Sequence, residues 1–113
     1  MTNYESPPAD LFRALSEPTR CAIVARLAQG SAPVGELAAP TGLRLPTVMR
    51  HIAVLEEAGL IATRKRGRSR ICTLRPQALA AGANWMERQQ RVWNARLDRL
   101  EAFVTENQPK DLP

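Results

Sequence analysis

The sequence holds few of the residues that build catalytic, metal or disulfide sites. It has one histidine and two cysteines among 113 residues. It also lacks a glycine-rich phosphate loop, a paired-carboxylate motif and an activated-nucleophile motif, which argues against an enzyme. A metal site needs three or four ligands, and the one histidine, His51, has no visible partner set. The sequence therefore predicts no catalytic residue, no metal site and no cofactor.

Long apolar runs and export signals are missing as well. No run approaches the roughly 18 apolar residues of a membrane span, and the first ten residues lack both the basic and the apolar region of a signal peptide. The two cysteines, Cys21 and Cys72, fit a reducing compartment and give no disulfide framework. We therefore expect a cytoplasmic protein.

Aromatic residues make up 4% of the chain, so the stacking surface that single-stranded RNA requires is not expected.

Positive charge is what the chain has in excess, and one stretch carries it. Residues 40–75 hold eight Lys or Arg and two Glu, a net charge of +6, whereas the whole chain is +5. The remainder of the chain therefore sums to −1. Like charges at this density repel one another, and they become favourable beside a polyanion. Such a local basic footprint is typical of nucleic-acid binding.

Within this stretch, residues 45–58 have the periodicity of an amphipathic helix. The apolar stripe for burial consists of Leu45, Val48, Ile52 and Leu55. Pro46 suits the first turn, where its missing N–H costs nothing, and Gly59 can take the left-handed conformation after the last turn. A second face, free of carboxylates, consists of Thr47, Arg50, His51 and Val54. Because the only carboxylates, Glu56 and Glu57, lie at the C-terminal end of the helix, the side chains of this face can donate hydrogen bonds to phosphates or base edges.

A basic hairpin is predicted directly after this helix. Residues 60–65 and 69–74 are short, partly alternating runs with β-branched residues, and Gly67 between them is the turn glycine. The hairpin region carries six basic residues and no acidic one, namely Arg64, Lys65, Arg66, Arg68, Arg70 and Arg75. A charge run is often only a solvated face. Its position beside the polar helix face favours contact with DNA instead.

The expected helices ahead of this pair lie at residues 9–15, 18–29 and 35–39, with an extended connector or one short strand at 31–34. Ser16 is a good N-cap for the second of them, and Pro18 suits its first turn. The core spacing of that helix is occupied by Cys21, Val24, Ala25 and Ala28, flanked by Ile23 and Leu27. A short third helix, a turn containing Gly42 and a longer helix with a polar face form a helix-turn-helix arrangement.

A long helix is predicted near the C-terminus, over residues 83–106, after a short helical segment that opens at Pro76 and is interrupted by Gly82. Its near-heptad stripe consists of Trp85, Gln89, Val92, Trp93, Arg96, Leu97, Leu100, Phe103 and Val104. The stripe could complete an intramolecular core. The other helices already supply a core, so a second subunit is the favoured partner, through the same stripe or the first helix.

Several motifs together resemble the ArsR family of winged-helix repressors. They are LFRALSEPTR, AIVARLAQG, VGELAAP, LPTVMRHIAVLEEAGLI and RKRGRSRICTL. The match covers residues 11–74, and the helix at 85–103 continues it in the manner of the family's metal-independent branch. The resemblance implies a dimeric winged helix that represses transcription at an operator, with residues 45–58 as the recognition helix and 61–74 as the wing.

The chain departs from the family pattern at several positions. Many relatives carry Ser where this chain has Arg44, a small polar residue at Met49, and a second Arg at Cys21. The third helix lacks the paired cysteines of the metal-sensing branch, and Asp98 and Glu101 on the last helix have no His near them in sequence. An operator sequence therefore cannot be transferred from a relative.

These observations predict one winged-helix domain of mainly α class with a small β-hairpin, divided into a tail at 1–8, a DNA-reading part at 9–75, dimerisation helices at 76–107 and a tail at 108–113. The expected DNA contacts are Arg44, Pro46, Thr47, Met49, Arg50, His51, Arg64, Lys65, Arg66, Arg68 and Arg70. The expected dimer contacts are Leu11, Phe12, Trp85, Gln89, Val92, Trp93, Arg96, Leu97, Leu100 and Phe103.

The predicted function is that of a sequence-specific regulator of double-stranded DNA, a homodimeric repressor at a palindromic operator. The alternative is a nucleic-acid or protein interaction module with a redox-responsive cysteine. We expect Cys21 to be a small buried hydrophobic residue and Cys72 to be a strand residue that packs inward. The basic surroundings of Cys72 could instead lower the pKa of its thiol and make it redox-reactive. For His51, a phosphate contact is favoured over helix packing.

Overall fold

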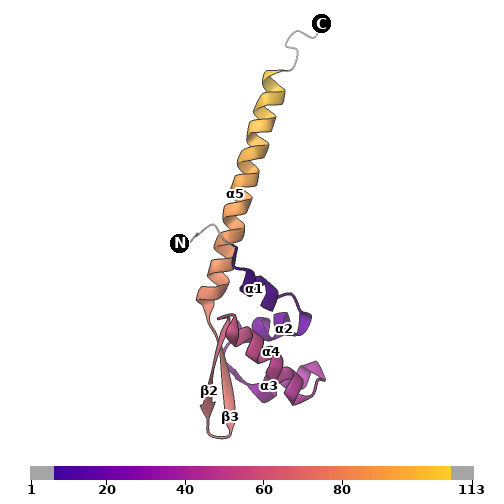
Figure 1. Cartoon of the computed structure of the whole chain (residues 1–113), viewed down its shortest axis with the longest axis vertical. Helices are drawn as coiled ribbons and strands as arrows, with labels where there is room; N and C mark the ends of the chain where they lie inside the picture. Colours follow the sequence, from indigo (N-terminus) through magenta and orange to yellow (C-terminus); the bar gives the residue numbers. More distant parts are fainter. Residues whose placement is uncertain (1–6, 108–113) are drawn as a thin grey trace.

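The computed structural model describes residues 7–107, which are mainly helical with one small sheet. Its elements are α1 (Ala9–Ala14), α2 (Pro18–Leu27), β1 (Ala32–Pro33), α3 (Val34–Ala38), the 3-10 turn η1 (Ala39–Thr41), α4 (Leu45–Glu57), β2 (Ile61–Arg66), β3 (Ser69–Leu74) and α5 (Pro76–Glu106). Figure 1 shows α1 to β3 gathered into a head, from which α5 projects as one rod. This confirms the predicted winged-helix fold class. The tails expected at 1–8 and 108–113 lie outside the described residues, apart from Pro7 and Pro8.

The sheet is antiparallel, with the strand order β1-β3-β2. Strands β2 and β3 form the predicted hairpin, hereafter the wing, in which Arg66 lies opposite Ser69. Gly67 has φ +61°, which explains why a glycine occupies the turn. The short β1 pairs Ala32 with Cys72 and so anchors the wing to the helices.

The core of the head lies where α4 crosses α2 and the base of the wing. From α4 it takes Val48, Ile52 and Leu55, which are almost completely buried and belong to the predicted stripe. Gly59 has φ +79° just after α4, as expected for its C-terminal turn, and Leu60 then enters the core. The helix predicted at residues 45–58 and its end are therefore confirmed, with α4 one residue shorter than expected.

Helix α2 buries a different face from the predicted one. Its buried residues are Ile23, Val24 and Leu27, whereas Cys21 is exposed. The predictions that placed Cys21, Ala25 and Ala28 in the core are wrong, because both faces of this helix have apolar residues at helical spacing and only the bulkier one packs inward. The N-cap is Glu17, whose carboxylate accepts from the Arg20 N–H at 3.0 Å, and not Ser16.

Helix α5 runs without a break through Gly82, so the predicted interruption is wrong. Gly82 is buried there, and a Cβ at this position would collide with the Leu11 side chain. The glycine therefore allows α1 to approach α5 closely. One turn later, the rings of Phe12 and Trp85 meet edge-on with centroids 5.6 Å apart.

Beyond this contact, α5 leaves the head. The radius of gyration is 21.5 Å, whereas a compact domain of this length has about 13 Å. The projecting part exposes large apolar side chains, namely Met86, Val92, Trp93, Leu97, Leu100, Phe103 and Val104. None of the described helices is long and apolar enough to span a membrane.

Candidate nucleic-acid interface

Helix α4 and the wing carry the candidate DNA contacts at the end of the head that points away from α5 (Figure 1). Helix α4 begins after Arg44, whose side chain makes no capping hydrogen bond, and Pro46 lies in its first turn as predicted. On the predicted polar face, Arg50 and Val54 are exposed, whereas Thr47 and His51 are half-buried. The guanidinium of Arg50 is thus presented to solvent, where a duplex can reach it.

Leu45, which was expected in the core, is 54% exposed. It lies on the same side of α4 as Val48, but the first turn of the helix extends past the end of the core, so about half of its surface stays open to solvent. Leu45 and Met49 instead line a hollow of about 300 Å³ between α4 and the wing, together with Arg68 and Arg70. The hollow therefore has an apolar floor and a basic rim.

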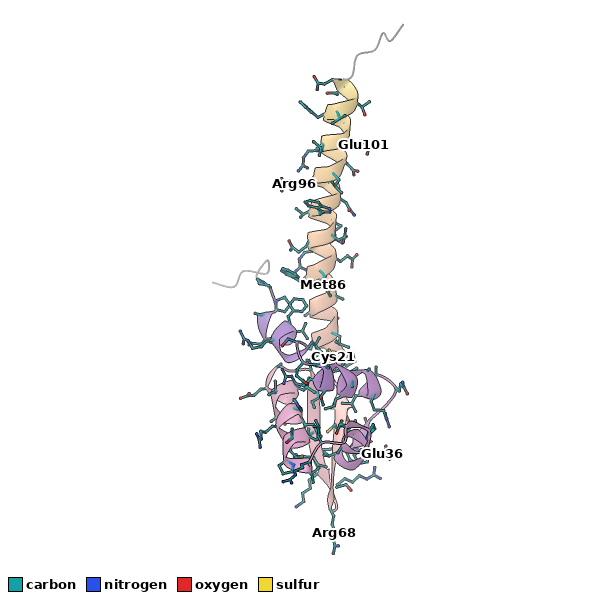
Figure 2. The ribbon with its side chains drawn as sticks, turned by 90° about the vertical axis from the view of Figure 1, so that its right-hand side faces the viewer. Cys21, Glu36, Arg68, Met86, Arg96 and Glu101 are labelled. Carbon is teal, nitrogen blue, oxygen red and sulfur yellow. The ribbon has the colours of Figure 1, made fainter. Side chains whose placement is uncertain are left out.

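The wing extends this basic surface away from α4. Its five basic side chains are all exposed, and they are Arg64, Lys65, Arg66, Arg68 and Arg70. Figure 2 shows Arg68 pointing outward from the tip of the wing, at the end of the molecule opposite α5. A basic wing in this position can follow the phosphate backbone beside the groove that α4 would enter.

A hydrogen-bond network joins the last turn of α4 to the wing, and sequence analysis did not foresee it. The Glu56 carboxylate accepts from the Thr63 N–H at 3.2 Å and from the Thr63 hydroxyl at 3.0 Å. The same hydroxyl accepts from Arg70 Nη1 at 2.9 Å. No sequence signal pointed to this pairing, because residues 56 and 63 meet only after the chain has turned at Gly59.

His51 ties α4 to the start of α2. Its Nδ1 lies 3.2 Å from Arg20 Nη1 and 3.6 Å from a Glu17 carboxylate oxygen, and its side chain is 17% exposed. Arg20 also donates to the Ala14 carbonyl at 2.6 Å, which holds the guanidinium in place. This is the packing role that the sequence left open, and a phosphate contact by the ring stays a prediction.

The same cluster affects the acidity of Glu17. Partial burial raises the pKa of this carboxyl, but hydrogen bonds from the backbone N–H groups of Thr19 and Arg20 and the nearby His51 outweigh it. The pKa therefore lies below its ordinary value, and Glu17 is a carboxylate at neutral pH.

The two cysteines have opposite environments. Cys72 is completely buried, as predicted, and burial raises the pKa of its thiol, with a further increase from the charge of Glu56. Cys21 is exposed, and its thiol donates to the Leu15 carbonyl at 2.9 Å. Among residues 7–107, no three His, Cys, Asp or Glu side chains come close enough together to hold a metal ion.

Comparisons with known proteins agree with this geometry. A helix-turn-helix domain family matches residues 15–64. The HTH-type transcriptional regulator Rv2034 of Mycobacterium tuberculosis is 43% identical over 81 residues, which cover 72% of this chain and 75% of that protein. A biofilm growth-associated repressor of Agrobacterium fabrum is 40% identical over 60 residues, which cover 53% of this chain and 51% of the repressor.

Solved structures give the same result. The crystal structure of an ArsR family transcriptional regulator superposes with a TM-score of 0.73 at 42% identity, covering 76% of this chain and 94% of that one. A homodimeric winged helix-turn-helix DNA-binding domain from Mycobacterium bovis superposes with a TM-score of 0.57 at 27% identity, covering 80% and 82%. The second of these neighbours is described as a winged helix-turn-helix, which is the arrangement that α3, α4 and the wing have here.

Proposed function

The chain belongs to the ArsR family of winged-helix transcriptional regulators, and from this we propose that it is a homodimeric repressor that binds a palindromic operator. Like its relatives, it is a DNA-binding transcriptional regulator, and it is not an enzyme. The observation that carries the proposal is the separation of two surfaces. The wing and the projecting part of α5 lie at opposite ends of the molecule (Figure 1). The wing carries exposed basic side chains, and this part of α5 carries exposed apolar ones.

The apolar stripe of α5 supports a second copy of the chain as its partner. In the projecting part of α5, the exposed residues Trp93, Leu97, Leu100 and Val104 recur every three or four positions, which is the pattern of a helix-helix seam. A two-fold dimer pairs the same patch from both subunits, so one stripe supplies both sides. The seam would use Val92, Trp93, Leu97, Leu100 and Phe103, with Gln89 and Arg96 at its border. Leu11, Phe12 and Trp85 pack within one subunit, so they would support the base of the seam from below and not form its main contacts. Residues 76–107 would thus hold the dimer, and residues 9–75 would read DNA.

In such a dimer, two copies of α4 would enter successive major grooves, about 34 Å or a multiple of that apart. We assign groove contacts to Arg44, Thr47 and Arg50, because they lie at or near the start of α4, where both arginines are exposed and Thr47 is half-buried. Pro46 and Met49 would pack beside them. The backbone contacts would come from His51, Arg64, Lys65, Arg66, Arg68 and Arg70.

A mobility-shift titration tests the proposal. The probes are a duplex from upstream of the chain's own gene and a scrambled duplex of equal length, at about 50 and 200 mM salt. We expect a specific shift with two chains per site, and with six to ten phosphates contacted, log affinity should fall against log salt with a slope of about −5 to −9. Equal shifts on both duplexes would contradict the assigned sequence specificity at that site.

We propose further that no metal is needed for this binding, as in the metal-independent branch that the sequence resembles. Neither a chelator nor added zinc should then change the shift. A change in operator affinity of tenfold or more upon adding zinc would reject this part of the proposal.

A further inference from the structure

We propose that Glu56 is a positioning residue for DNA binding, because its carboxylate fixes the angle between the wing and α4. The proposal rests on the proposed function, since it concerns the same DNA interface. Glu56 itself contacts no DNA in this scheme. It acts through Thr63 and Arg70.

The contact lies where the wing leaves the core. Ile61 and Cys72 at the base of the wing are buried, whereas every residue from Arg64 to Arg70 is exposed. Thr63 is the last residue before that exposed part. Its backbone N–H lies on the outer edge of β2, which has no neighbouring strand on that side, and the Glu56 carboxylate accepts this hydrogen bond.

The network spans all three elements of the interface. Glu56 is in the last turn of α4, Thr63 is in β2, and Arg70, which donates to the Thr63 hydroxyl, is in β3. One carboxylate oxygen thus receives two hydrogen bonds from the first strand, and the hydroxyl passes the restraint to the second. The carboxylate also lies close enough to the sheet to contribute to the raised pKa of Cys72.

Leverage makes this contact important for DNA binding. A six-residue strand is about 20 Å long, so a change of about 10° at the base would move the tip of the wing by about 3.5 Å. A hydrogen bond to a phosphate tolerates only a few tenths of an ångström around 2.9 Å. A small loss of restraint at Thr63 would therefore remove the phosphate contact of Arg68 at the tip of the wing.

Electrostatics alone predicts the opposite effect. A carboxylate near DNA repels the phosphates, so its removal should strengthen binding. The sign of the effect therefore separates a positioning role from a bystander role. Glu57, the next residue on α4, is exposed and makes no hydrogen bond to the wing among the described residues, so Glu57→Ala is a control with the same change in charge.

The test measures operator affinity, salt dependence and tryptic cleavage of the full chain for Glu56→Ala, Glu56→Gln, Thr63→Val and Glu57→Ala. Operator duplexes come from in vitro selection with the wild type. We expect Glu56→Ala to bind about tenfold more weakly, with a salt slope smaller in magnitude by about 2, because one wing phosphate contact per subunit is lost. Glu56→Gln should bind like the wild type, because an amide oxygen accepts the same bonds. Thr63→Val should lose part of the affinity.

Cleavage by trypsin in the arginine-rich wing gives a readout without DNA. It should be several-fold faster in Glu56→Ala than in Glu57→Ala at equal thermal stability, because a released wing samples cleavable conformations. Tighter or unchanged binding by Glu56→Ala, matching Glu57→Ala, would overturn the positioning role while leaving the repressor proposal intact. Failure of the wild type to select any sequence, together with equal cleavage of the variants, would overturn both.

Discussion

We expect Trp93→Ala to convert the protein from a dimer to a monomer at micromolar concentration. Trp93 is 54% exposed on the projecting part of α5. A large aromatic side chain buries about 150–250 Å², so about 100 Å² of Trp93 is left for a partner to cover. At about 25 cal/mol per Å² this corresponds to about 2.5 kcal/mol per subunit. Because a two-fold seam contains the residue twice, the dimer would lose up to about 5 kcal/mol.

Even half of that loss would raise the dimer dissociation constant by about sixtyfold, since each 1.4 kcal/mol is about a factor of ten. Sedimentation equilibrium over a concentration series measures the constant directly. Arg99→Ala is the control, because it truncates a long side chain on the polar side of the same helix. A dissociation constant for Trp93→Ala within threefold of the wild type would refute the seam, and so would a wild type that is monomeric at micromolar concentration.

Three further predictions concern the head. Arg50→Ala should lose about 1–3 kcal/mol more binding free energy on the operator than on random DNA if Arg50 contacts a base, whereas Arg68→Ala at the wing tip should weaken binding to all sequences similarly. Titrations on both duplexes measure these losses. Equal losses on the two duplexes for Arg50→Ala would exclude Arg50 from base recognition. Exposed Leu45 should contact a thymine methyl, so replacing operator thymines by uracil should weaken the wild type but not Leu45→Ala; equal losses in both proteins would exclude that contact. A thiol reagent should modify Cys21 quickly and Cys72 only at higher pH or after unfolding, since burial raises the pKa of Cys72; fast modification of Cys72 at neutral pH would contradict the core placement.

The sequence predicted the parts of the fold that depend on local rules. The stripe of Val48, Ile52 and Leu55 and the glycines at 59 and 67 gave α4, its end and the turn of the wing. Each of these signals lies within about one helical turn or one hairpin turn of the feature that it defines. The basic residues of the wing could also be assigned to its surface from the sequence, because a hairpin with so many like charges cannot bury them.

The errors arose where a residue's surroundings come from distant parts of the chain. Leu45 has the right spacing for the stripe, but spacing cannot tell where the core ends, and α4 extends past it. Cys21 lies on one of two apolar faces of α2, and only the bulk of Ile23 and Leu27 against α4 decides between them. His51 gained Glu17 and Arg20 as neighbours only through the packing of α2 on α4.

Gly82 shows how such a distant contact shapes function. In sequence it reads as a helix breaker, but in the fold it accommodates the side chain of Leu11, which is 71 positions earlier. This contact joins the head to α5, and Phe12 and Trp85 extend it by one turn. If α5 pairs two subunits, the direction of each head relative to the seam is set here, and with it the distance between the two copies of α4. The spacing of operator half-sites would then depend on a packing contact that lies far from the DNA.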